Sequence, residues 1–144
     1  MRRPRLSLVK FVAVSMLSVG LLGLSAGTAS ADRPVEVSFL ETFTDVNPCT
    51  GDKQELTINN VASIHEHGDR QVVHVDRTGT TSGGYVMDHG VLTIVLNGHV
   101  ARQTFTDNWV DSNGSRFQAH GSFVDNLNQG ELMVDRFSLR CIKP

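Results

Sequence analysis

Residues 91–110 read VLTIVLNGHVARQTFTDNWV, which is two strand-like runs around an Asn-Gly pair. The first run, Val91 to Leu96, is almost wholly apolar, as is typical of a strand that is covered on both faces. In the second run Phe105 and Trp109 alternate with polar side chains, which indicates a half-buried strand. Asn-Gly tolerates the positive φ of tight turns, so we predict a two-residue hairpin between Val91–Leu96 and His99–Phe105.

The same alternation continues on both sides of this stretch, and residues 32–144 contain no convincing ten-residue helical pattern. Turn-forming residues separate the apolar runs at strand-length intervals; they are Asn47-Pro48, His67-Gly68-Asp69, Gly79 to Gly84, Asn113-Gly114 and Asn128-Gln129-Gly130. We therefore predict one all-β domain of about seven or eight short antiparallel strands. A barrel is favoured over a sandwich, because closing the sheet removes its exposed edges.

The loop at Asn113-Gly114 decides which aromatic side chains share a face. A two-residue turn there would place Phe105 and Phe117 on opposite faces of the sheet. A loop of three or five residues places all four nearby aromatic side chains on one face, so we expect the longer loop. These are Phe105, Trp109, Phe117 and Phe123. They line a ligand cavity or simply fill a small core, and the core is the favoured interpretation.

The first 31 residues have the three parts of a secretory signal. Arg2, Arg3, Arg5 and Lys10 make a basic start, and an apolar run from Phe11 to Leu24 follows. Ala29-Ser30-Ala31 then offers the small-x-small pattern that signal peptidase recognises. We expect residues 1–31 to be removed and residues 32–144 to be secreted, to the cell envelope or outside the cell. The apolar run is short for a membrane span, so none is expected in the mature form.

Charge excludes one class of partner. All 15 acidic residues lie after Ala31, whereas four of the 13 basic residues lie before it, so residues 32–144 carry a formal charge of −6. No cluster of lysine or arginine interrupts this acidic background. Nucleic acid is therefore not an expected partner, because its binding depends on neutralising phosphates.

The chain has two cysteines, Cys49 and Cys141. In an exported domain two cysteines most simply form one disulfide, which here would close a loop of about ninety residues. Two free buried thiols are the alternative. A metal pair is less favoured, because the cysteines are far apart in the sequence.

Histidines are the best candidates for metal chemistry. Pairing Ile64 with Val73 would place three of them on one face of a hairpin, with Asp76 further along. They are His65, His67 and His74. Three imidazoles can hold Zn²⁺ or Cu²⁺. Arg70 would repel a cation there and no second shell is evident, so a solvated outer face is favoured and we expect neither a metal nor a cofactor.

No catalytic residue can be assigned from the sequence. There is no Gly-x-Ser-x-Gly elbow, and the cysteines are better explained as a bridge. Asp107/Asp111 and Asp125/Glu131 could each form an acid–base pair, but we interpret all four as solvated carboxylates near strand ends and turns. Asn113-Gly114-Ser115 matches the N-glycosylation triplet, and it also matches a plain hairpin tip.

The chain resembles a group of uncharacterised secreted proteins of actinobacterial type. The shared features are Phe43 followed by Asn47-Pro48-Cys49-Thr50-Gly51, a histidine-containing strand pair, Gly83-Gly84-Tyr85, and a last strand with Phe137-x-Leu139-x-Cys141. The chain looks shorter than those proteins between Asp76 and Tyr85. The resemblance implies a signal peptide, an all-β domain and a terminal disulfide, and it implies no activity.

Two function classes follow. A non-catalytic binding or cell-surface protein is the leading hypothesis, with a small molecule or another extracellular partner, because the sequence offers a scaffold without an assembled active site. A small β-barrel enzyme, isomerase- or cyclase-like and acting on an apolar small molecule, is the alternative. It would require a buried His, Asp or Glu with a perturbed pKa inside the sheet.

Overall fold

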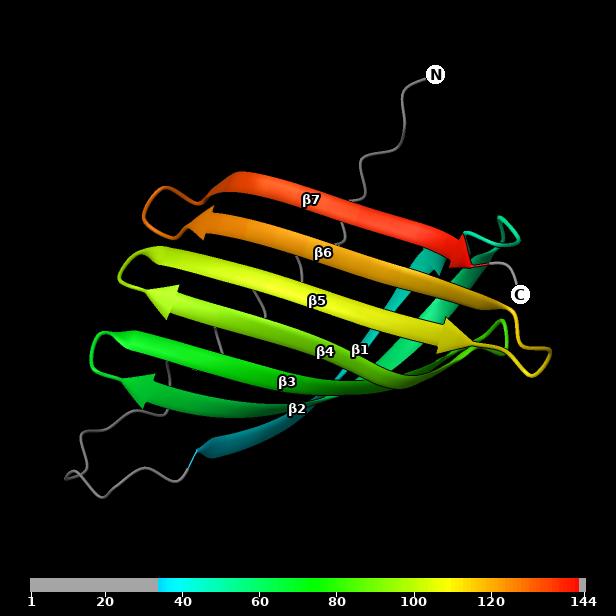
Figure 1. Cartoon of the computed structure of the whole chain (residues 1–144), viewed down its shortest axis with the longest axis horizontal. Helices are drawn as coiled ribbons and strands as arrows, with labels where there is room; N and C mark the ends of the chain where they lie inside the picture. Colours follow the sequence, from blue (N-terminus) through cyan, green and yellow to red (C-terminus); the bar gives the residue numbers. More distant parts are fainter. Residues whose placement is uncertain (1–33, 143–144) are drawn as a thin grey trace. The chain divides into compact units, whose positions relative to one another are not determined.

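The computed structural model describes residues 34–142, so the predicted signal peptide lies outside the described residues. The described chain forms seven strands and no helix (Figure 1). They are β1 (Val35–Val46), β2 (Lys53–His67), β3 (Arg70–Thr81), β4 (Val86–Asn97), β5 (Val100–Val110), β6 (Arg116–Asn126) and β7 (Glu131–Ile142). The all-β prediction is confirmed. Within this part of the chain no helix is long and apolar enough to cross a membrane.

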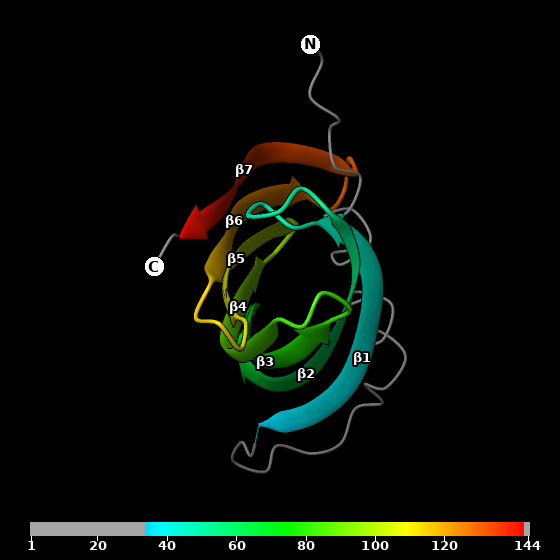
Figure 2. The ribbon, with the colours of Figure 1, turned by 90° about the vertical axis from the view of Figure 1, so that its right-hand side faces the viewer.

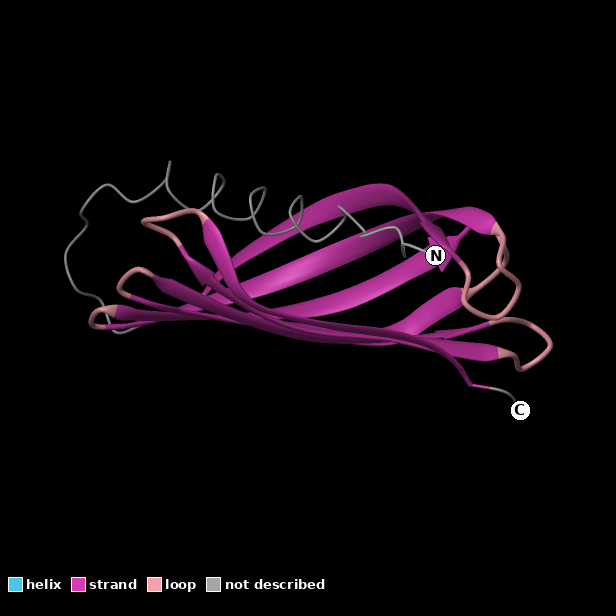
Figure 3. Cartoon of the chain, turned by 90° about the horizontal axis from the view of Figure 1, so that it is seen from above, coloured by secondary structure: helices cyan, strands magenta, loops and turns pink. Residues whose placement is uncertain are grey.

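The strands form one antiparallel sheet in which each strand pairs with its neighbours in sequence, from β1 to β7. A single sheet removes the sandwich from consideration for residues 34–142. The sheet curls strongly (Figures 2 and 3). Its two edges are β1 and β7, which Figure 2 labels. The predicted closure is not present, because no hydrogen-bonded ladder joins β1 to β7 in the described chain.

A disulfide joins the two edges instead. Cys49, in the loop after β1, is bonded to Cys141 of β7, with Cα atoms 4.9 Å apart and a sequence separation of 92. The predicted bridge is therefore present. It ties the β1–β2 loop to the last strand at one end of the sheet.

Two predicted registers are confirmed. In the β2–β3 hairpin Ile64 pairs with Val73, as the apolar pattern requires. Between β5 and β6, Val110 pairs with Arg116, which leaves the predicted five-residue loop at 111–115. The side chains of Phe105, Trp109, Phe117 and Phe123 therefore share one face, which we call the inner face because the sheet curls around it.

The β4–β5 turn differs from its prediction by one residue. Asn97 pairs with Val100, so the two turn residues are Gly98 and His99 rather than Asn97 and Gly98. Gly98 then takes the positive φ of 56° that suits glycine. The observed register also places two large apolar residues, Leu92 and Phe105, directly opposite each other on the inner face, and this packing selects it.

The prediction that residues 91–96 are covered on both faces was wrong. Leu92 and Ile94 are buried on the inner face, whereas the outward Val91 and Val95 are only partly buried. The reason is that the described chain forms a single sheet, so no second layer covers the outer side of β4.

The main apolar core lies on the inner face at the disulfide end of the sheet. The indole of Trp109 stacks on the ring of Phe117, with ring centroids 5.6 Å apart. The centroids of the Tyr85 and Phe117 rings are 5.0 Å apart. Leu56, Ile58 and Met87 complete this cluster, with Phe43, Cys49 and Leu139 packed against it. Toward the opposite end Phe105 and Phe123 stack at 6.0 Å. The aromatic residues thus fill much of the interior, in line with the core interpretation.

Candidate functional site

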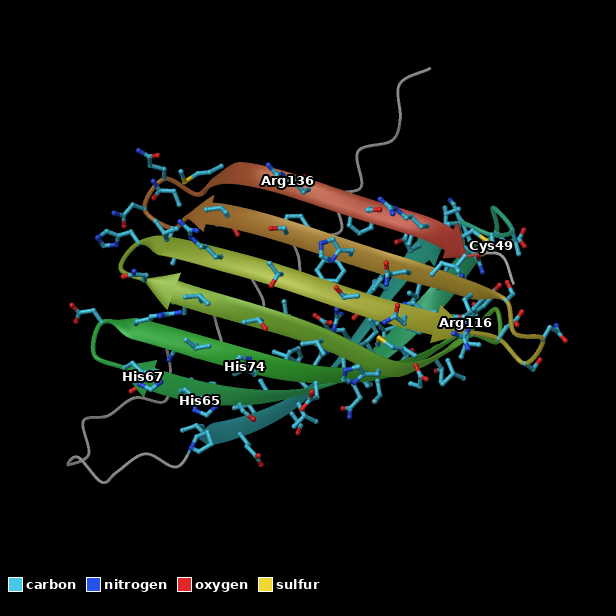
Figure 4. All side chains as sticks on the ribbon, viewed as in Figure 1. Cys49, His65, His67, His74, Arg116 and Arg136 are labelled. Atoms are coloured by element: carbon cyan, nitrogen blue, oxygen red, sulfur yellow. A yellow bond between two sulfur atoms is a disulfide. The ribbon has the colours of Figure 1, made fainter. Side chains whose placement is uncertain are left out.

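The structure places the predicted histidines on the outer face. His65, His67 and His74 lie at the β2–β3 hairpin end of the sheet, away from Cys49 (Figure 4). The rings of His65 and His74 are 5.9 Å apart. Within residues 34–142 no three groups of metal-binding type converge, so the described structure does not bring the three histidines together as ligands.

The prediction that Asp107 is a solvated carboxylate near a turn was wrong. Asp107 lies within β5, is 4% exposed, and points to the inner face beside Trp109. Its suggested partner Asp111 instead organises the β5–β6 loop, where its carboxylate accepts hydrogen bonds from the amides of Asn113 and Ser115. The two carboxylates therefore do not form an acid–base pair.

The second suggested pair was Asp125 and Glu131. Asp125 lies on the inner face and accepts a 3.3 Å hydrogen bond from the amide of Gln103. Burial raises the pKa of Asp125, the Gln103 hydrogen bond lowers it, and the neighbouring Asp135 raises it. Glu131 begins β7, where it pairs with Asn126 through the backbone.

The glycosylation triplet forms part of the β5–β6 loop. Asn113 is exposed, and the Ser115 hydroxyl lies 3.0 Å from the Tyr85 hydroxyl. The Ser115 hydroxyl thus gives the Tyr85 hydroxyl a hydrogen-bond partner at the edge of the apolar core. This hydrogen bond accounts for a serine at position 115 independently of any glycosylation at Asn113.

Four side chains meet in the middle of the inner face, and we call them the inner polar cluster: Glu41, Asn60, Arg77 and Asp107. The Arg77 guanidinium donates from Nη1 to Asp107 Oδ2 at 2.7 Å and from Nε to Asn60 Oδ1 at 3.0 Å. Its Nη2 lies 3.4 Å from Glu41 Oε2, which also accepts a 3.1 Å hydrogen bond from Asn60 Nδ2. Arg77 is therefore held from β1, β2 and β5 at once.

The strand register explains why these residues meet. Asn60 pairs with Arg77, Arg77 with Gly90, and Gly90 with Asp107, so they form one row across four strands. Glu41 comes from the adjacent row on β1, where it pairs with Ile58. Directly paired residues point to the same face of a sheet, so the whole set points inward.

A β-bulge in β4 makes room for the ion pair. The pairing shifts between Met87 and His89, which inserts one extra residue and brings Gly90 between Arg77 and Asp107. A Cβ atom at Gly90 would lie 2.5 Å from Asp107 Oδ1 and 3.2 Å from the Cβ of Arg77. Only glycine leaves space for the two side chains here.

The electrostatics of the cluster are dominated by burial. Burial raises the pKa of Asp107 to about 6; the Arg77 charge and hydrogen bond lower it, and the Glu41 carboxylate raises it. Asp107 Oδ1 is buried and has no hydrogen-bond partner in the described structure. One guanidinium thus faces two carboxylates, and one carboxylate oxygen has an unused acceptor position.

The inner face is accessible from the two edge strands. Phe137 of β7 pairs with Gly121 on this face, yet it is 39% exposed. Val35 of β1 pairs with Ile64 on the same face and is 56% exposed. Between these edges Phe105 contacts Phe137 at 6.3 Å and lies 5.7 Å from the Arg77 guanidinium carbon. Exposed apolar side chains therefore flank the inner polar cluster.

The sequence contains a signal for this cluster, although no short motif marks it. Arg77 lies two residues after Val75, and Asp107 lies between Phe105 and Trp109 in the same alternation. Strand periodicity therefore assigns both charges to the apolar side. Charged residues at inward positions of a strand are rare unless they are paired, which makes them better candidates than the carboxylates near turns.

No protein-family model, no curated protein sequence and no solved structure matches this chain significantly.

Proposed function

We propose that this chain is an exported, disulfide-bonded binding protein that holds a small molecule on the inner face of its sheet. The inner polar cluster carries the proposal: a buried ion-paired group lies among apolar and aromatic side chains, a combination typical of small-molecule sites. The cluster would orient the ligand, and the apolar side chains around it would bind the rest of the molecule.

Export is supported by the disulfide, because such bridges persist in oxidising compartments. Binding without catalysis is favoured by the state of Arg77, whose guanidinium is engaged by three side chains. No nucleophile with an adjacent base is evident among the inward residues that the structure describes.

The test uses N-phenyl-1-naphthylamine, a neutral apolar dye whose fluorescence rises in apolar surroundings. We expect the purified protein to enhance its emission. The variant Phe137→Ser should bind the dye more weakly, because it removes an exposed ring from the inner face. Leu40→Ser is the matched control, since Leu40 is 67% exposed on the outer face of the other edge strand. Absence of enhancement, or equal effects of the two variants, would reject the proposal.

A second candidate is the small enzyme, and one observation favours it. Burial holds the pKa of Asp107 near 6, which suits proton transfer close to neutral pH. An isomerase- or cyclase-like reaction on an apolar small molecule would use such a group. Recovery of a chemically changed ligand, with turnover lost in Asp107→Asn while binding persists, would favour the enzyme over the binding protein.

A further inference from the structure

The two faces of the sheet carry opposite kinds of charge. Among the lysines and arginines of residues 34–142, Arg77 points inward, whereas the other six point outward by strand alternation. They are Lys53, Arg70, Arg102, Arg116, Arg136 and Arg140. Carboxylates are distributed differently, because six strand residues with acidic side chains point inward. They are Glu41, Asp45, Glu66, Asp107, Asp125 and Asp135.

This arrangement leaves the inner face with an excess of negative charge. Arg77 is a single cation against six carboxylates, and its own charge is offset by Glu41 and Asp107. A face that is curled and partly apolar screens such charges less well than open water does. The inner face therefore favours a positively charged ligand over a neutral or negative one.

Hydrogen-bond acceptors without a partner on the inner face also favour a ligand that is cationic or that donates hydrogen bonds. Asp107 is 4% exposed, and its Oδ1 has no hydrogen-bond partner in the described residues. Gln54 is 5% exposed, and its Oε1 is likewise unpartnered. A buried acceptor without a donor costs free energy. These two unpartnered oxygens therefore show that the inner face is short of hydrogen-bond donors rather than of acceptors. A ligand that brings a cation or a donor supplies what is missing.

Aromatic rings add a third feature. Phe105 and Phe137 are 6.3 Å apart on the inner face, and Phe137 is exposed at the β7 edge. The faces of aromatic rings attract cations, and they also pack against apolar groups. Carboxylates together with phenylalanine rings are a suitable environment for an ammonium group attached to an apolar body.

We infer that the ligand of the inner face is an organic cation, an amine or quaternary ammonium with an apolar body. This inference rests on the proposed function and specifies its ligand class. Glu41, which is 14% exposed at the edge strand β1, is the most accessible acid of the inner polar cluster. Asp135 provides an exposed carboxylate on the same face at the opposite edge, β7.

The experiment compares three probes that share one alkyl chain, namely decyltrimethylammonium, 1-decanol and decanoate. Each competes with N-phenyl-1-naphthylamine for the purified protein at concentrations below aggregation. We expect decyltrimethylammonium to displace the dye at a concentration about tenfold lower than decanoate does, because one favourable charge contact is worth about that factor. Added salt should reduce this preference.

Variants locate the preference. Asp135→Asn and Glu41→Gln should each reduce the ratio between the concentrations of decanoate and decyltrimethylammonium that displace the dye. Glu36→Gln should not, since Glu36 lies on the same strand as Glu41 but points outward. Asp135 is exposed, so its variant remains informative if Glu41→Gln fails to fold.

The outcomes separate the two proposals. If the dye binds but the three probes displace it equally, or decanoate displaces it best, the cation inference is wrong and the binding function stands. If Glu36→Gln narrows the ratio as much as Asp135→Asn does, the preference comes from overall charge and the assignment to the inner face is wrong. If the dye does not bind at all, both proposals fail.

Discussion

The Arg77 guanidinium donates a 2.7 Å hydrogen bond from Nη1 to Oδ2 of Asp107, although 30 residues separate them in the chain. Both side chains are about 5% exposed, so this is a buried ion pair. It links β3 to β5 across the glycine that β4 places between them.

Removing one partner of the pair should be strongly destabilising. Arg77→Leu leaves the Asp107 carboxylate buried without its counter-charge, and we expect a loss of about 3–5 kcal/mol in the free energy of unfolding. Urea denaturation measures it. The double variant Arg77→Leu/Asp107→Leu should recover most of that loss, because it removes both charges. A double variant as unstable as the single one would show that packing, and not the charge pair, is responsible.

Stability should fall as the pH rises toward neutral. Burial raises the pKa of Asp107 from 3.8 to about 6, so the folded state holds a proton that the unfolded state has lost. The resulting stabilisation is complete below pH 3.8 and disappears as the pH rises through 6, a change of up to about 3 kcal/mol. Burial also raises the pKa of Asp45 and Asp125, which adds in the same direction. Asp107→Asn should reduce the dependence of the free energy of unfolding on pH. A free energy of unfolding that rises between pH 4 and 7 would contradict this account.

The disulfide should be a major contribution to stability. Cys49 and Cys141 are 92 residues apart, and closing a loop of that length stabilises by about 4–5 kcal/mol in a chain-entropy model. A reducing agent should therefore lower the urea midpoint substantially. The variant Cys49→Ser/Cys141→Ser should already have the lower midpoint and should not respond to reduction. Equal midpoints for the reduced and oxidised protein would rule out this contribution.

Gly79→Ala should destabilise the sheet near its apolar core. An added Cβ would lie 2.6 Å from the Thr57 carbonyl oxygen and 3.1 Å from the Trp109 ring, and the backbone of β2 cannot move freely. We expect a loss of about 1–3 kcal/mol, typical of overpacking, measured by thermal and urea unfolding. Thr80→Ala, at an exposed outward position, is the control and should have little effect. Comparable losses in the two variants would argue against the steric explanation.

We expect no stabilisation of the folded protein by metal binding at the outer histidines. His65 and His74 are adjacent, with ring centroids 5.9 Å apart, and no further group converges on them in the described chain. Addition of Zn²⁺ at neutral pH should leave the melting temperature unchanged, as measured by differential scanning fluorimetry. A rise that disappears in His65→Ala/His74→Ala would instead identify a metal site.

The sequence by itself determined the features that depend on local pattern. Period-2 alternation identified the strands, because successive side chains of a strand point to opposite faces. It also set the β2–β3 register through Ile64 and Val73, since a slip of one residue would turn the apolar side chains of one of the two strands outward. The disulfide followed because residues 32–144 offer a single possible pair of cysteines.

Only the tertiary structure decided which inward side chains meet. Alternation assigns Arg77 and Asp107 to the inner face, but it does not say that they lie in the same cross-strand row. The bulge after Met87 sets that alignment, and Gly90 makes the space, neither of which is encoded by the hydrophobic pattern alone. The openness of the sheet was decided at the same level. Closure depends on how far seven strands curl, which is the sum of many small twists along the sheet, whereas the pattern of any one strand records only which of its sides is buried.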